Sequence, residues 1–244
     1  MSSCQFTRRE QRLVARLRTP LQVQQWLNAL PYNAEPGGDT QRSFRTVVAL
    51  GTAHCMEAAL SAAVILEAHD WPPLVMSLES EDKLDHVVFV YRTATGWGSI
   101  ARSRDPGLHG RRPVFRTVRD LACSYIDPYV DVSGRITGYG VLDLRTLGPY
   151  DWRCAPHNLW HVEQVLIDLP HRAIRSSDGR IARLRSRYHA FMEAHPGFKP
   201  LYYQGQDRWH PLPGAFASSV RLSRRIGRDA SPKRPSRAEA EPRS

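Results

Sequence analysis

The chain has 244 residues, of which 24% are charged, and a formal net charge of +10. This length can bury a sizeable core in one domain, and the longest apolar stretch, 58–66, is too short to span a bilayer. The N-terminus has no apolar segment of signal-peptide length, so we expect a cytoplasmic protein rather than a secreted or membrane protein.

Cysteine spacing and charge distribution argue against further classes. Cys4, Cys55, Cys123 and Cys154 form no C-x-x-C pair, which favours free thiols in a reducing compartment over a disulfide framework or a zinc site. We expect neither a metal nor a cofactor. Residues 219–244 hold eight Lys/Arg against three Asp/Glu, half of the net charge. The remaining charge is too diffuse to predict sequence-specific nucleic-acid binding.

The first third of the chain is predicted to be helical. Two amphipathic segments precede a turn-rich loop, and a short helix or an extended segment follows. A longer central helix must end before Trp71-Pro72-Pro73, because proline lacks an amide and disfavours helix in the residue before it. The expected helices are 7–18, 19–30 and 54–68, with the loop at 31–40 and the ambiguous segment at 42–50.

A strand-rich segment follows the central helix. Val, Phe and Tyr succeed one another in "DHVVFVYR", as in a largely buried strand. The turn "TATG" joins this strand to "GWGSIARS" in an antiparallel hairpin. We expect an extended lead-in at 72–80, the hairpin strands at 85–92 and 96–103, a helix at 113–127 and a further strand at 134–147.

The last third is predicted to contain two core-facing helices, at 157–171 and 178–195, and then a disordered tail. The tail is rich in Arg, Ser and Pro and cannot bury enough apolar surface to offset the entropy of ordering. The expected organisation is an N-terminal helical segment, a core, a C-terminal helical extension packed on the core, and the tail, at 1–24, 25–150, 151–217 and 218–244.

Cys55 is the candidate nucleophile. It stands at the expected start of the central helix, where unpaired amides lower the pKa of a thiol, and the glycine in "ALGTAHC" lets a substrate approach the backbone. The alternative is that Cys55 only packs, because cysteine is among the most buried residue types.

His86 is the candidate base, because the sheet would fix the ring of a histidine at a strand end while one nitrogen stays accessible. If Ala94-Thr95 is a two-residue loop, paired positions place His86 opposite Ser103, with Asp105 diagonal on the same face. Strict register favours Ser103 as the group that orients the imidazole. Chemistry favours Asp105, because a carboxylate also stabilises the imidazolium.

A helix-borne Cys, a strand-borne His and an acid on the next strand occur in this order in the transglutaminase-like branch of papain-like cysteine enzymes. The segment "AHCMEAALSAAVILEAHDWPP" resembles the nucleophile helix of that family, and "DHVVFVY" with "GWGSIARSRDP" resembles its His and Asp strands. The resemblance covers roughly residues 25 to 130. The family's acid usually ends the Trp-containing strand, where this chain has Ser103, two residues before Asp105.

The resemblance implies an α+β fold, with the nucleophile helix packed on an antiparallel sheet, and acyl chemistry through a Cys55-His86-Asp105 triad on a peptide or protein amide. Cys55 would attack the carbonyl, and water or an amine would resolve the thioester. Hydrolysis is favoured over transfer, because nothing marks an amine-acceptor site. The Cys55 amide and one of Gln25, Asn28 and Asn33 would bind the oxyanion, and Trp97 is either a wall of the site or part of the core.

The segment "RSRDPGLHGRR", 102–112, gathers arginines directly after the expected acid and could bind an anionic substrate or remain solvated. It supports an alternative function. In this alternative the domain is a catalytically silent transglutaminase-like scaffold that binds a protein or a polyanion through this loop and the tail.

Overall fold

The helices that open the chain each begin at a polar cap. The computed structural model describes residues 5–229. The side chains of Thr7, Thr19, Ser43 and His54 each accept a hydrogen bond from a backbone amide in the first turn that follows. These four residues directly precede α1 (Arg8–Arg16), α2 (Pro20–Ala29), α3 (Phe44–Leu50) and α4 (Cys55–Glu67), respectively.

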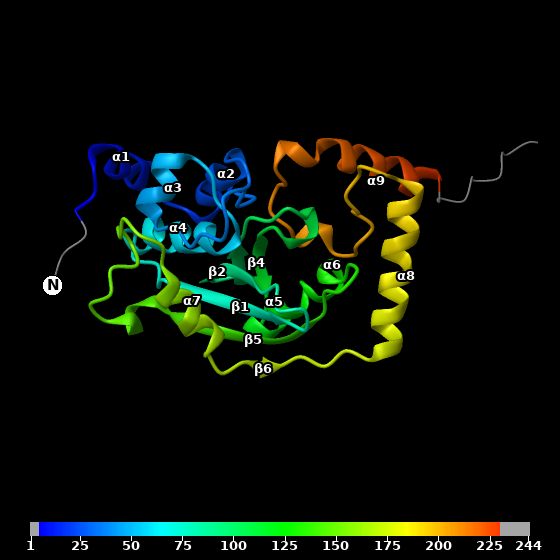
Figure 1. The fold of residues 1–244 in the computed structure, drawn as a ribbon. Coiled ribbons are helices and arrows are strands. Elements are labelled where there is room, and N and C mark those ends of the chain that lie inside the picture. Colours follow the sequence, from blue (N-terminus) through cyan, green and yellow to red (C-terminus); the bar gives the residue numbers. More distant parts are fainter. Residues whose placement is uncertain (1–4, 230–244) are drawn as a thin grey trace, which may run out of the picture.

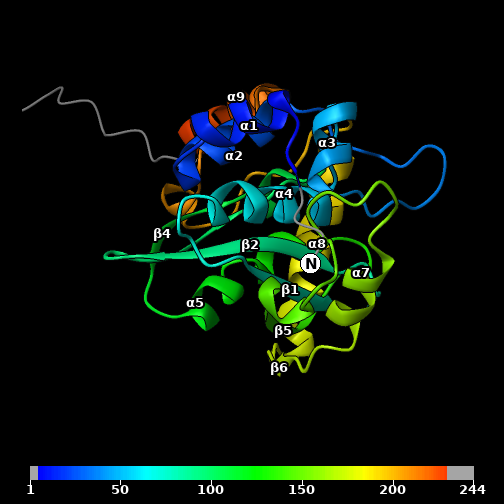
Figure 2. The ribbon, with the colours of Figure 1, turned by 90° about the vertical axis from the view of Figure 1, so that its left-hand side faces the viewer.

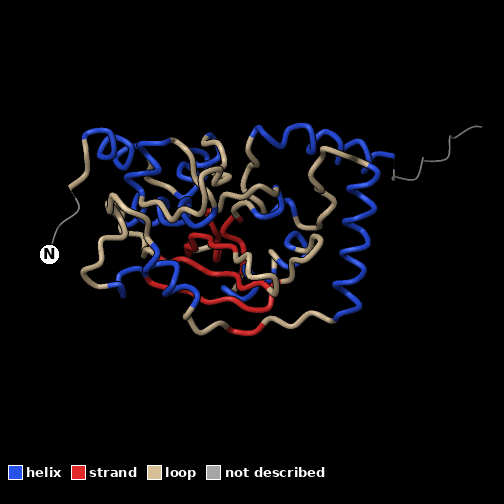
Figure 3. The backbone as a smooth tube through the Cα atoms, viewed as in Figure 1, coloured by secondary structure: helices blue, strands red, loops and turns tan. Residues whose placement is uncertain are grey.

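Within residues 5–229, the strands form one antiparallel sheet of six strands in the order β4-β3-β2-β1-β5-β6, so the fold is α+β (Figure 3). The predicted hairpin is confirmed, with Thr93 opposite Gly96 across a two-residue loop. The strands are β1 (Leu74–Ser80), β2 (His86–Thr93), β3 (Gly96–Ile100), β4 (Arg111–Phe115), β5 (Ile136–Asp143) and β6 (Arg172–Ala173).

Both faces of the sheet are buried, which explains the continuous apolar run in β2. Val87, Phe89 and Tyr91 point into a core beneath α4, while Val88 and Val90 point into a second core on the opposite face. In Figure 2, α4 lies directly on the sheet and α1, α2 and α3 cover α4 from outside. The second core is closed by α5 (Val118–Cys123) and α6 (Ile126–Tyr129).

The C-terminal part contributes to both cores, with Val162 and Leu166 in the core beneath α4 and Ile174 in the second core. Helix α7 (Trp160–Ile167) buries Val162 and Leu166, whereas the long α8 (Asp178–Ala194), upright at the edge of the molecule in Figure 1, buries only Ile181. The segment that follows α8 places Trp209 against Arg111, with the guanidinium 4.7 Å from the ring centroid.

Two sequence predictions are wrong in part. The expected helix at 113–127 begins as β4, because pairing with β3 and Pro113 favour a strand there, and only α5 and α6 are helical. The expected disordered tail from 218 instead contains most of α9 (Ala217–Asp229), in which Leu222 is buried. Residues 230–244 of the predicted tail lie outside the described residues.

Candidate functional site

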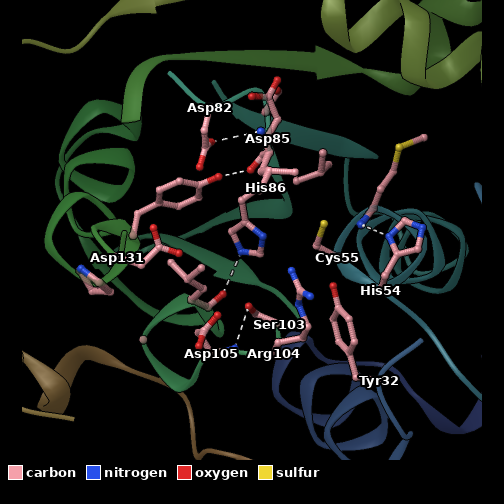
Figure 4. Close-up of a pocket in the computed structure, with 18 of the residues that line it drawn as sticks. Tyr32, His54, Cys55, Asp82, Asp85, His86, Ser103, Arg104, Asp105 and Asp131 are labelled. Atoms are coloured by element: carbon pink, nitrogen blue, oxygen red, sulfur yellow. Dashed lines mark hydrogen bonds between the residues drawn. The ribbon is translucent and has the colours of Figure 1, made fainter. Parts of the chain in front are cut away.

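A cavity of about 430 Å³ lies where the N-terminus of α4 meets the start of β2. Cys55 is the first residue of α4 and His86 the first of β2, and both line the cavity. Figure 4 shows the sulfur of Cys55 facing the imidazole of His86. The fold therefore brings together the two residues that the sequence predicts as nucleophile and base.

A backbone carbonyl orients the imidazole. His86 Nε2 lies 2.9 Å from the Leu108 oxygen (Figure 4). A carbonyl can only accept, so Nε2 carries the proton and Nδ1 keeps the lone pair toward the thiol. The ring also packs edge-on against Tyr125, with centroids 5.9 Å apart. The contact with Leu108 thus fixes the tautomer that a base needs.

Neither predicted orienting group fills this role. The register is as expected, but pairing ends at Phe89–Ile100, and beyond that point the chain leaves the sheet. Asp105 pairs instead with Lys199, its Oδ1 2.8 Å from Nζ, and Ser103 Oγ accepts from the Asp105 amide at 3.1 Å. Asp105 supports the site through its own carbonyl, which accepts from the Leu108 amide at 3.1 Å.

The segment that carries Leu108 is fixed by a buried arginine. The side chain of Arg111 is buried and donates to the carbonyls of Gly107 and His109, each at 2.6 Å, while its guanidinium lies 4.1 Å from the Tyr125 ring centroid. Burial lowers the pKa of Arg111 to about 10. Because Leu108 lies between these two carbonyls, Arg111 holds the acceptor of His86 in place.

This finding corrects the prediction of an exposed arginine loop. Arg102 is also buried and donates to the carbonyls of Leu30 and Ser103. Of the arginines in 102–112, only Arg104 and Arg112 are exposed. The loop is mainly an internal scaffold, so it does not present the anion-binding surface that the sequence suggested.

The N-terminus of α4 is tied to the preceding loop by a fully buried carboxylate. Glu57 accepts from the His54 amide at 3.0 Å, from Thr40 Oγ1 at 2.8 Å and from Asn33 Nδ2 at 3.2 Å. The guanidinium of Arg42 lies 3.6 Å away. Sequence reasoning missed this role, although an acidic residue three positions after a helix cap is a known signal.

His54 caps the same helix. Its Nδ1 accepts from the Met56 amide at 3.2 Å, and its Nε2 lies 2.7 Å from the Thr40 carbonyl. No hydrogen bond to the Cys55 amide is recorded within residues 5–229. The cap therefore leaves the first amide of the helix free beside the thiol.

The surroundings of Cys55 change its acidity. Burial by itself raises the pKa of the thiol, but the imidazoles of His54 and His86 outweigh burial and hold this pKa well below the usual range. The positive end of α4 acts in the same direction. Cys55 is thus placed to form a thiolate near neutral pH.

The three predicted oxyanion donors lie elsewhere. Gln25 is exposed on α2, and Asn28 donates to the Pro211 carbonyl. Asn33 is buried and donates to Thr40 and Glu57. Trp97 packs against the second core and does not line the cavity. Tyr32, which sequence reasoning did not single out, does line it.

Cysteine chemistry differs from the prediction at one position. Cys55 and Cys123 are free, but Cys154 is disulfide-bonded. The expectation of a cytoplasmic location rested partly on free thiols, and Cys154 removes that part of the argument. Within residues 5–229, no helix is long and apolar enough to cross a membrane. The same residues contain no group of three or more His, Cys, Asp or Glu able to hold a metal ion.

Comparison with known proteins assigns neither a family nor a function to the chain. No model of a protein family matches the chain, and no curated protein matches its sequence. The geometry of the cavity is therefore the basis for a functional proposal.

Proposed function

We propose that the chain is a cysteine-dependent acyl enzyme of the papain-like, transglutaminase-like kind, acting through a Cys55-His86 dyad. The main support for this proposal is that the free thiol of Cys55, at a helix N-terminus, faces the imidazole of His86. The far nitrogen of this imidazole donates to the Leu108 carbonyl. The order of helix, His strand and following strand also agrees with the family resemblance. The acid of the usual triad is replaced here by a backbone carbonyl.

The proposed reaction uses these groups in two steps. The thiol proton passes to His86 Nδ1, and Sγ attacks the carbonyl carbon of an amide. The imidazolium then returns the proton to the leaving amine, which departs as the C–N bond breaks. Water, deprotonated by His86, cleaves the thioester and releases a carboxylic acid. Water is the proposed acceptor, because the sequence marks no dedicated amine-acceptor site.

The pH dependence of alkylation tests this proposal. We expect iodoacetamide to modify Cys55 with an apparent pKa well below the reference of about 8.5, because the imidazoles stabilise the thiolate. Cys123 is the internal control, since burial raises its pKa, and mass spectrometry of digests follows both sites. If Cys55 is inert or titrates with Cys123, the enzyme proposal fails and the silent-scaffold function takes its place.

The charge of the cavity favours a cationic substrate over the anionic one suggested by the sequence. Among the described residues, six carboxylates besides the Lys199-paired Asp105 line the cavity, against the cations of Lys83 and Arg104. Burial raises the pKa of two of the carboxylates, Asp85 and Glu163, and a bound cation would offset this effect. The six carboxylates are Glu35, Asp39, Asp82, Asp85, Asp131 and Glu163.

Charged thiol reagents measure this preference. We expect a methanethiosulfonate with a trimethylammonium group to modify Cys55 about tenfold or more faster than the sulfonate analogue, after division by their rates with 2-mercaptoethanol. The ratio should fall as salt rises, because the Debye length shrinks to about 10 Å at 0.1 M. Equal corrected rates at low salt would contradict a cationic substrate, without bearing on the dyad.

A further inference from the structure

Tyr32 occupies the side of the cavity opposite the imidazole, close to the nucleophile. Its ring rises from the loop after α2, and Figure 4 shows the phenol oxygen directed at Cys55. The structure records no hydrogen bond to this oxygen among the described residues. The phenol hydroxyl is therefore available to a ligand in the cavity.

The position of Tyr32 is fixed by its backbone. Tyr32 forms a parallel bridge with Ala53, two residues before Cys55, and the amide of Asn33 donates to the Ala53 carbonyl at 3.2 Å. The segment that bears the phenol is thus joined to the segment that bears the thiol. Movement of one relative to the other would break this bridge.

The ring of Tyr32 is also held by cations. The guanidinium groups of Arg102 and Arg104 lie 5.8 and 5.9 Å from the ring centroid, and Arg102 is anchored to the Leu30 carbonyl at 2.9 Å. Burial and the nearby Cys55 raise the pKa of the phenol, so it keeps its proton at neutral pH. Tyr32 is consequently a preorganised donor and a poor base.

Acyl chemistry at Cys55 needs such a donor. When Sγ attacks a carbonyl, an electron pair moves onto the oxygen, and donors placed in advance for this charge lower the barrier. The free Cys55 amide at the N-terminus of α4 can supply one donor. Gln25, Asn28 and Asn33 are exposed or already paired, so another residue must supply the second hydrogen-bond donor.

We infer that Tyr32 is a catalytic residue, which donates its phenol proton as a hydrogen bond to the oxyanion beside the Cys55 amide. The inference rests on the proposed function, because it requires an acyl step at Cys55. It differs from a role for Tyr32 as a cavity wall, which would need the ring but not the hydroxyl. It also differs from a role in activating the thiol, which would affect every reaction of Cys55.

Two reactions of the same thiol separate these roles in Tyr32→Phe. p-Nitrophenyl acetate acylates Cys55 through a tetrahedral oxyanion, which collapses to a thioester and releases p-nitrophenolate. Iodoacetamide alkylates Cys55 by displacement of iodide, and no oxyanion forms. We expect the acylation rate constant to fall by about 100-fold or more, whereas the alkylation rate and its pH profile stay unchanged. Tyr150→Phe, which removes a phenol hydroxyl outside the cavity, should change neither reaction.

Every other result overturns the inference. Unchanged acylation in Tyr32→Phe would make Tyr32 a wall only, and an equal fall in both reactions would place its effect on the thiolate or on folding. If wild-type Cys55 is neither acylated nor preferentially alkylated, the proposed function itself fails and the inference falls with it. The wild-type measurement thus separates the two failures.

Discussion

His86→Ala is expected to lower the rate of acylation of Cys55 by about 10²- to 10⁴-fold, the range for loss of a positioned general base. The thiol then has no acceptor for its proton at the start of the reaction. The pKa of Cys55 should rise at the same time, because burial still raises it and one of the two opposing imidazoles is gone. Alkylation at neutral pH should slow, and its pH profile should shift to higher pH.

Asp105→Asn is the matched control for this prediction. A triad that used Asp105 would lose most of its activity in this variant, because the imidazolium would lose its carboxylate. In this structure the Asp105 carboxylate contacts Lys199, and both side chains are about 40% exposed. Loss of an exposed pair costs at most about 1 kcal/mol, so we expect acylation within about fivefold of wild type. A loss comparable with that of His86→Ala would contradict the role given to the Leu108 carbonyl.

Glu57→Ala is expected to destabilise the protein by about 3–5 kcal/mol, the usual cost of removing one partner from a buried charged pair. The Glu57 side chain is fully buried, and its loss removes the carboxylate beside the Arg42 guanidinium and one acceptor each from the Asn33 amide and the Thr40 hydroxyl. Urea unfolding measures the effect as a lower midpoint at an unchanged slope. Because Glu57 also fixes the His54 amide, Cys55 alkylation should become less selective.

Glu67→Ala provides the control on the same helix. Glu67 lies in the last turn of α4 and pairs with Arg153 at 2.7 Å, but its side chain is 26% exposed. Water can replace this partner, so we expect a loss of about 1 kcal/mol or less. Similar losses in the two variants would show that Glu57 has no special role at the start of the helix.

Local signals determined the elements that bear the reactive groups. The sequence predicts a start of α4 near His54, and its end before Trp71-Pro72-Pro73 follows from the prolines. The unbroken apolar run of β2 indicated a largely buried strand, and the two-residue turn set the hairpin register. Cys55 and His86 could therefore be chosen from the sequence alone.

Contacts between distant segments decided which groups orient His86 and how the loop beside it is held. The end of β3 at Ile100 depends on the chain leaving the sheet, which makes a register argument fail at Ser103 and Asp105. The partner of His86 is a backbone carbonyl, and every residue has one, so no side-chain pattern could identify Leu108. The burial of Arg111 depends on Trp209, about a hundred residues away, and turns an apparently solvated loop into a scaffold.

The sequence by itself thus determined the candidate nucleophile, the candidate base and the elements that carry them, because prolines, tight turns and strand patterns act over a few residues. Only the tertiary structure decided what orients the base, which phenol faces the thiol and what charge the cavity carries. Tyr32 reaches Cys55 through a bridge between loop segments, and the acidic lining is assembled from several separate elements. Such juxtapositions depend on packing between distant parts of the chain, which no local pattern records.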